Sequence, residues 1–119
     1  MEEQKVCCMF SDPVPGHAVD NADLKLLAKE EWSRKEYRIY RCEKCGACVL
    51  YGYEEEASYG GWDNAVIDEV YYPIEDPTDG GRLDAYPETV TVIKGARCLH
   101  TRYMEEDWAK DRSWRFNET

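Results

Sequence analysis

The segment Cys42-Glu43-Lys44-Cys45-Gly46 constrains the fold of this 119-residue chain more than any other. Two cysteines two residues apart, followed by glycine, are typical of a zinc knuckle, in which a tight turn directs both thiolates at one ion. Because glycine has no Cβ, backbone N–H groups can approach the sulfurs without a clash. A structural zinc site takes four ligands, so two more must come from another part of the chain.

Cys7 and Cys8 are the natural donors of the missing pair, because the second half of a ribbon usually comes from an N-terminal hairpin. Neighbouring residues on a strand point to opposite faces, so both can bind only if the backbone turns there. Otherwise one of them binds together with His17, and Cys48 is a further alternative. The zinc ligands predicted from the sequence are Cys7, Cys8, Cys42 and Cys45.

Other arrangements of cysteine and histidine are less favoured. Cys98 and His100 are expected on a helix about 200° apart, which prevents them from chelating one ion or acting as nucleophile and base. Cys42-x2-Cys45-x2-Cys48 resembles the start of an iron–sulfur run, but the Cys-Pro that would follow is replaced by Gly52 and Tyr53. We therefore expect a structural zinc ion, no catalytic residues and no enzyme activity.

Composition limits the compartment and the partners. The first five residues do not resemble a signal peptide and no apolar run reaches the roughly 20 residues of a membrane span, so a cytoplasmic protein is expected. The net charge is −10 and unevenly distributed: residues 45–93 hold eleven acids against Arg82 alone, whereas residues 25–44 sum to +3. This pattern favours a basic protein partner over nucleic acid.

Residue patterns predict an α+β fold: a small antiparallel zinc-ribbon-like sheet with one N-terminal and one long C-terminal helix. Alternation predicts strands over 5–10, 37–42, 49–53 and 68–73. Apolar residues at spacings of three and four predict helices over 22–32 and 87–108. Residues 54–61 and 75–86 are expected to be loops. We expect one domain, 1–119, with a ribbon-like part over 5–54 and a strand plus C-terminal helix over 62–115.

The chain carries four segments in a fixed order, namely Tyr37 to Gly46, Val70-Tyr71-Tyr72-Pro73, Pro87 to Val90 and Ala96 to Leu99. These segments resemble the motifs of an uncharacterised bacterial and phage family with a zinc-ribbon start, a Tyr-Tyr-Pro strand and a helical region related to HEPN-type domains. The resemblance implies association with restriction and defence systems. The Arg-x4-His nuclease motif of active HEPN proteins is absent here, which implies that no RNase activity accompanies the resemblance.

The favoured function is a non-enzymatic acidic interaction or inhibitor protein that binds a nuclease, toxin or defence enzyme. Its partner-binding residues are expected to be Glu54, Glu55, Glu56, Trp62, Asp63, Asp68, Glu69, Glu75 and Asp76. The alternative is a nucleic-acid-binding zinc ribbon that uses Lys35, Arg38, Arg41 and Lys44 on phosphates, with Tyr37 and Tyr40 stacking on bases. Trp108 and Trp114 leave a homodimer open.

Overall fold

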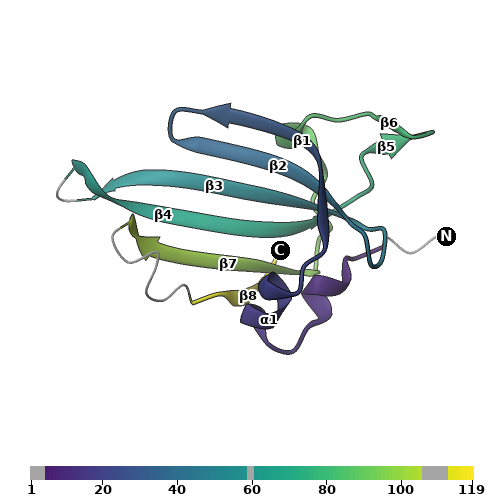
Figure 1. Cartoon of the computed structure of the whole chain (residues 1–119), viewed down its shortest axis with the longest axis horizontal. Helices are drawn as coiled ribbons and strands as arrows, with labels where there is room; N and C mark the ends of the chain where they lie inside the picture. The colour runs from purple at the N-terminus through teal and green to yellow at the C-terminus, as the bar shows by residue number, and fades with distance from the viewer. Residues whose placement is uncertain (1–4, 59–60, 106–112) are drawn as a thin grey trace.

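The chain forms a six-stranded antiparallel sheet in the strand order β1-β2-β3-β4-β7-β8 (Figure 1). The computed structural model describes residues 5–58, 61–105 and 113–119, with the backbone alone for residues 58 and 61–64. The sheet strands are β1 (Leu24–Trp32), β2 (Lys35–Cys42), β3 (Cys48–Ser58), β4 (Gly61–Ile74), β7 (Arg97–Met104) and β8 (Arg115–Glu118). A two-stranded hairpin of β5 (Thr78–Asp79) and β6 (Arg82–Leu83) stands out from one end of the sheet.

Helical structure within the described residues is confined to short segments, among them the 3-10 turns η1 (Cys8–Ser11) and η2 (Pro87–Thr89) and the helix α1 (Pro15–Asp20). The expected α+β fold with a long C-terminal helix is therefore wrong, and the protein is mostly an antiparallel sheet. None of the described helices has the length and apolar character needed to cross a membrane.

Two apolar clusters cover one end of the sheet, one on each face. On the first face the N-terminal segment brings Phe10 and Ala18 against Val49 and Leu99. The cluster on the second face is formed by sheet residues with two valines that follow η2, namely Ile39, Leu50, Ile74, Val90 and Val92. The sheet is thus sandwiched between two segments that have little regular structure of their own.

The alternating patterns in the middle of the chain are confirmed as strands. The strands predicted over 37–42, 49–53 and 68–73 lie within β2, β3 and β4. The polar residues 54–58, expected in a loop, instead extend β3, where Glu54 pairs with Asp68 and Glu56 with Val66. The turn expected at Asp79-Gly80-Gly81 is present in the β5–β6 hairpin, and both glycines have positive φ angles of 58° and 85°.

The helix expected over 22–32 is the strand β1, and a β-bulge accounts for the error. The register with β2 shifts between Leu26 and Ala28, so Leu27 is the extra residue. Beyond a bulge the alternation changes phase, and side chains swap faces. Leu24 accordingly packs in the first cluster, while Leu27 and Ala28 pack in the second. The resulting apolar spacing of three and one imitates a helix face.

The helix expected over 87–108 is also wrong. Among its described residues, 87–105, Pro87–Thr89 forms a short helical turn, Val92 bridges to Ile74, and Arg97–Met104 is strand β7, while 106–108 lie outside the described residues. Gly95, with a φ of 81°, interrupts the segment before β7. Ala96 to Leu99, matched above to a helical region, therefore lead into and form this strand. The strand expected over 5–10 is irregular up to Cys7 and then enters η1.

Leu99 offers a test of the core. Its side chain is fully buried in the first cluster, so Leu99→Ala should lower the free energy of unfolding by about 2–5 kcal/mol. Leu26→Ala removes the same atoms from a residue that is 48% exposed and should change the free energy of unfolding by less than about 0.5 kcal/mol. Urea denaturation of both variants measures the difference, and equal losses would contradict the assigned core.

Candidate metal centre

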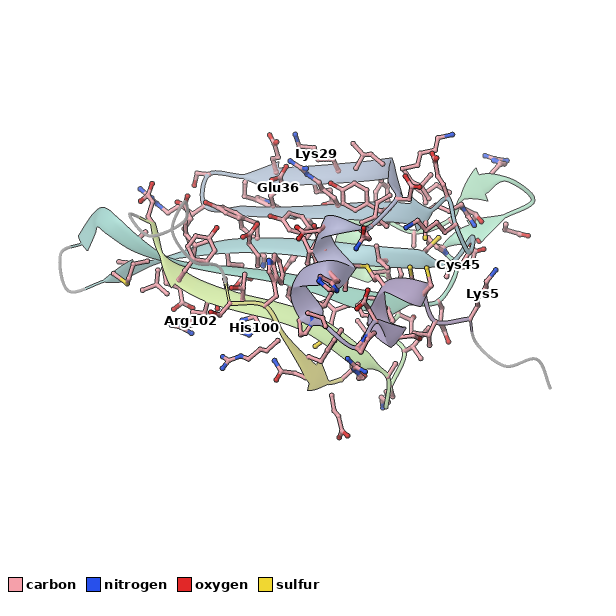
Figure 2. The ribbon with its side chains drawn as sticks, turned by 60° about the horizontal axis from the view of Figure 1, so that its bottom comes forward. Lys5, Lys29, Glu36, Cys45, His100 and Arg102 are labelled. Carbon is pink, nitrogen blue, oxygen red and sulfur yellow. The ribbon has the colours of Figure 1, made fainter. Side chains whose placement is uncertain are left out.

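Four cysteine sulfurs meet where the N-terminal segment reaches the turn between β2 and β3. The Sγ atoms of Cys7, Cys8, Cys42 and Cys45 all lie within 4.8 Å of one another. Cys7 Sγ is 3.7 Å from Cys45 Sγ, and Cys8 Sγ is 3.8 Å from Cys42 Sγ. Figure 2 shows the sulfur atoms gathered beside the labelled Cys45. The sequence prediction had named these same four residues, and the structure brings them together.

A change in backbone direction lets two adjacent cysteines reach the same point. Cys7 precedes η1 in an extended conformation (φ −58°, ψ 141°), and Cys8 is the first residue of that turn. The N–H of Phe10 closes the turn by donating to Cys7 O over 3.1 Å. Neighbours on a regular strand would diverge, whereas this turn directs both thiols at the knuckle.

The knuckle is a tight turn that ends β2 and starts β3. Gly46 N–H donates to Cys42 O, and Cys42 N–H donates to Ala47 O, both over 2.8 Å. Gly46 has a φ of 81°, a conformation that costs a residue with a Cβ far more than glycine. The turn thus places Cys42 and Cys45 side by side, as the glycine in the sequence predicted.

The environment of the thiols differs from one cysteine to the next. Burial raises the pKa of the Cys7 thiol well above its ordinary value, and the neighbouring Cys42 and Cys45 add to the effect. Burial also acts to raise the pKa of Cys45, but hydrogen bonds from the backbone N–H groups of Cys8 and Ala47, together with those from the thiols of Cys42 and Cys7, outweigh it and lower the value to about 7. The backbone nitrogen of Cys8 lies 3.5 Å from Cys45 Sγ. The centre therefore holds one readily formed thiolate, Cys45, beside the buried Cys7, whose ionisation is disfavoured.

Two of the sulfur–sulfur distances match those expected around a single tetrahedral ion. Metal–sulfur bonds of about 2.3 Å in tetrahedral geometry put the sulfurs roughly 3.8 Å apart, close to the two distances given above. A disulfide would need about 2.05 Å, and each of the four cysteines is free. The group could hold a metal ion, with four sulfur ligands and no position left for a substrate.

The other ligand candidates lie elsewhere. Cys48 is buried in the apolar cluster on the second face, so it does not complete an iron–sulfur run. His17 is an exposed residue of α1 and is not among the grouped ligands. Cys98 and His100 were expected on opposite sides of a helix; they are instead alternate residues of β7, with Cys98 buried and His100 Nε2 3.0 Å from Asp68 Oδ1.

Polar contacts tie the metal centre to the segments around it. Lys44 Nζ donates to Asn21 O over 2.6 Å, and Glu43 N–H donates to Asp23 O over 2.7 Å, which holds the knuckle against the chain after α1. Arg41, next to Cys42, has Nη1 2.9 Å from Gly46 O and Nη2 3.0 Å from Thr78 Oγ1. The same side chain pairs with Asp76 at 3.3 Å. The knuckle is thus linked to the base of the β5–β6 hairpin.

The acidic residues predicted to bind a partner are mostly engaged within the sheet. Glu54 pairs with Lys35, Glu55 with Arg34, and Glu56 and Asp68 with Arg102. Glu69 is buried and accepts hydrogen bonds from the hydroxyls of Tyr51 and Tyr103 over 2.6 and 2.8 Å. Asp76 pairs with Arg41, and Glu75 donates its N–H to Thr91 O. The side chains of Trp62 and Asp63 lie outside the described residues.

Two features with binding potential, Leu83 and a hollow on the second face, were missed at the sequence level. Leu83 in β6 is 41% exposed, and Tyr86, which the sequence indicates as an aromatic contact for a partner, follows it and is 73% exposed. A hollow on the second face contains His100 and Asp68, which come together only through the pairing of β4 with β7. The exposed apolar residues beside Asp79-Gly80-Gly81 were a readable signal for the first, whereas the second depends on strand register.

Comparisons with protein-family models, with curated proteins and with solved structures give no match to this chain.

Replacing a ligand tests the centre. The purified protein should carry about one metal ion per chain, and Cys45→Ser should lose it. Because metal binding contributes folding free energy, the melting temperature should fall by about 10 °C or more, at roughly 4 °C per kcal/mol. Cys98→Ala changes a buried cysteine outside the group and should retain the metal. A Cys45→Ser protein with unchanged metal content and melting temperature would refute the site.

Proposed function

We propose that this protein is a non-enzymatic interaction protein in which a zinc ion, held by the four cysteines, stabilises the fold and an acidic hairpin binds a basic partner. The partner class is a nuclease, a toxin or a defence enzyme, which makes an inhibitory or immunity-like role the most consistent one. The observation that carries the proposal is the composition of residues 75–93, which contain the protruding β5–β6 hairpin, η2 and the connections between them and are called the hairpin segment below. The hairpin segment holds five acids against Arg82 alone, a net charge of −4, and exposes two large apolar side chains.

Zinc is the ion that the donor set favours. Four cysteine sulfurs in tetrahedral spacing are typical of structural zinc, and a closed shell of four protein ligands holds chain segments together rather than binding a substrate. Thiols kept free for a metal are also consistent with a reducing, cytoplasmic compartment. Here the ligands come from the N-terminal segment and the β2–β3 turn. A zinc ion would therefore fasten one covering segment to the sheet.

The hairpin differs from the rest of the acidic segment in its available charge. Carboxylates of β3 and β4 are compensated by neighbouring strands: Glu54 by Lys35, and Asp68 by Arg102. Among the described residues, the carboxylates of Asp79, Asp84 and Glu88 make no ion pair, and all three residues are exposed. Uncompensated charge attracts an oppositely charged partner and raises the rate of association.

Leu83 and Tyr86 provide the exposed apolar and aromatic surface that charge alone does not supply to an interface. Binding energy at protein interfaces concentrates in a few apolar and aromatic side chains, with tyrosine over-represented among them. Tyr86 is 73% exposed and is the N-cap residue of η2. Its backbone N–H donates to Thr89 Oγ1 over 3.0 Å, which fixes the backbone at this position. The tyrosine is thus presented on an ordered backbone beside three free carboxylates.

Nucleic-acid binding through the ribbon receives less support. The four bases expected to contact phosphates are each engaged: Lys35 with Glu54, Arg38 with Glu36, Arg41 with Asp76, and Lys44 with Asn21 O. A polynucleotide would have to displace these contacts against a net charge of −10. The compensated bases therefore favour a protein partner.

The hairpin charges can be tested by neutralisation. Tagged protein should capture a basic protein from cell lysate at low salt and release it as salt is raised, because exposed charges are screened. The triple variant Asp79→Asn, Asp84→Asn, Glu88→Gln should lose most of this binding. A control with the same change in net charge, Asp20→Asn, Asp23→Asn, Glu118→Gln, should retain it.

Two results would contradict the proposal. One is the absence of any captured basic protein at low salt. The other is equal weakening by the two triple variants, which would show that total charge rather than the hairpin governs binding. For a captured partner, Tyr86→Ala should cost about 2 kcal/mol of binding free energy, measured by calorimetry.

A further inference from the structure

A hollow of about 230 Å³ opens on the second face of the sheet, away from the metal centre. Its lining residues come from four neighbouring strands and are Tyr37, Gly52, Glu54, Asp68, Val70, Tyr72 and His100. Tyr37 and Tyr72 also pack against the apolar cluster of this face, so the hollow lies where that cluster ends. In Figure 2, His100 and Arg102 are labelled next to each other along β7.

Gly52 shapes the floor of the hollow. It is paired with Tyr37 on one side and with Val70 on the other. A Cβ at this position would lie 3.1 Å from Tyr37 Cε1 and 3.2 Å from Val70 Cγ1, closer than ordinary van der Waals contact. The absence of a side chain in the middle of β3 therefore lets Tyr37 and Val70 close in on the buried Gly52, and these three residues line the hollow together. Glycine weakens a strand interior and often marks a place where another group approaches closely.

Two carboxylates face each other at the rim. Glu54 and Asp68 are direct partners across β3 and β4, an arrangement of like charges that destabilises a sheet unless cations compensate it. On the outer sides the row continues with Lys35 opposite Glu54 and Arg102 opposite Asp68. The row thus reads plus, minus, minus, plus, and the two carboxylates share no cation between them among the described residues.

Each carboxylate is held in place by an uncharged or weakly basic neighbour. The hydroxyl of Tyr37 donates to Glu54 Oε1 over 3.3 Å, and His100 Nε2 lies 3.0 Å from Asp68 Oδ1. Lys35 Nζ approaches the same Glu54 Oε1 at 3.6 Å, so Glu54 Oε2 makes no hydrogen bond within the described residues. The rim therefore offers fixed acceptors to a further donor.

The protein's own cations show what this surface binds. The guanidinium of Arg102 contacts Glu56 Oε2 at 3.2 Å and Asp68 Oδ2 at 3.7 Å, and so spans carboxylates of two adjacent strands. Lys35 Nζ lies 4.9 Å from the centre of the Tyr37 ring, a cation–π distance. A planar guanidinium can donate to two carboxylates at once, which a compact ammonium does less well.

We infer that the hollow is a binding site for the guanidinium group of an arginine side chain, supplied by the basic partner proposed above. The guanidinium lies at the rim between Glu54 and Asp68 and donates to both, while Tyr37, Tyr72 and Val70 surround its methylene stem. The inference rests on the proposed function for the source of the arginine, but the site itself can be tested without the partner.

The probes are Nα-acetyl-arginine amide, Nα-acetyl-lysine amide and the uncharged isostere Nα-acetyl-citrulline amide, titrated at low salt and pH 8, where an ordinary histidine is neutral. Amide chemical shifts should change at positions 52, 54, 68, 70 and 100. The arginine compound should bind tightest, and the citrulline compound should bind at least about tenfold more weakly, since it cannot form charge-assisted hydrogen bonds to the carboxylates.

Two variants of equal charge locate the site. Glu54→Gln should weaken binding of the arginine compound by about tenfold, and Asp84→Asn on the hairpin by less than about twofold. Gly52→Ala, whose Cβ would displace the lining side chains of Tyr37 and Val70, should also weaken binding of the arginine compound while the spectrum stays dispersed. Equal effects of Glu54→Gln and Asp84→Asn, shift changes confined to the hairpin, or equal binding of the citrulline compound would overturn the inference.

Failure here is distinguishable from failure of the proposed function. If the hairpin variant loses partner capture and the arginine compound causes no shift changes at the hollow, the proposed function stands and the arginine site is refuted. If the arginine compound binds specifically but no partner is captured, the arginine site stands and the proposed function is refuted.

Discussion

The fold depends on a contact between segments that are far apart in the sequence and have little regular structure of their own. Cys8 and Cys42 are separated by 34 positions and Cys7 and Cys45 by 38, yet their sulfurs lie 3.8 and 3.7 Å apart. The segment before β1 contributes Phe10 and Ala18 to the cluster on the first face. In a chain of this size, where the core is limited, a metal ion at this point would keep that segment on the sheet.

Charge within the sheet follows the strand pairing. The acidic strands β3 and β4 lie between the more basic β2 and β7, so carboxylates and bases from separate parts of the sequence meet across the sheet. Glu54 with Lys35 and Asp68 with Arg102 are directly paired residues. Such exposed pairs each contribute little to stability, but together they remove free charge from the sheet. The uncompensated acids of the hairpin then dominate what a partner would meet.

The side chain of Arg41 links the metal-binding knuckle to the base of the β5–β6 hairpin. It contacts Gly46 O in the knuckle and Thr78 and Asp76 at the base of the hairpin. A metal centre that orders the knuckle would therefore also order the hairpin. This link connects the two halves of the proposed function, since the binding element is mounted on the segment that the cysteines fix.

Sequence patterns were sufficient where structure is local and insufficient where it depends on strand register. The knuckle could be predicted because Gly46 and the cysteine spacing determine one turn, and β2 and β3 because their residues alternate. The bulge at Leu27 shifted the alternation of β1 into helical spacing, and nothing in the sequence distinguishes the two. The spacing of Val92, Leu99 and Tyr103 wrongly predicted one helix. Val92 bridges to Ile74 before Gly95, whereas Leu99 and Tyr103 belong to β7 after it, so these residues do not share one element. Charge compensation and the hollow above Gly52 required the pairing of four strands to be known.

X-ray absorption spectroscopy of the metal bound to the purified protein tests the central claim most directly. We expect a zinc edge and a single shell of four sulfur atoms at about 2.3 Å from the metal. A shell containing nitrogen or oxygen in place of one or more sulfurs, or protein that folds without any bound metal, would contradict it.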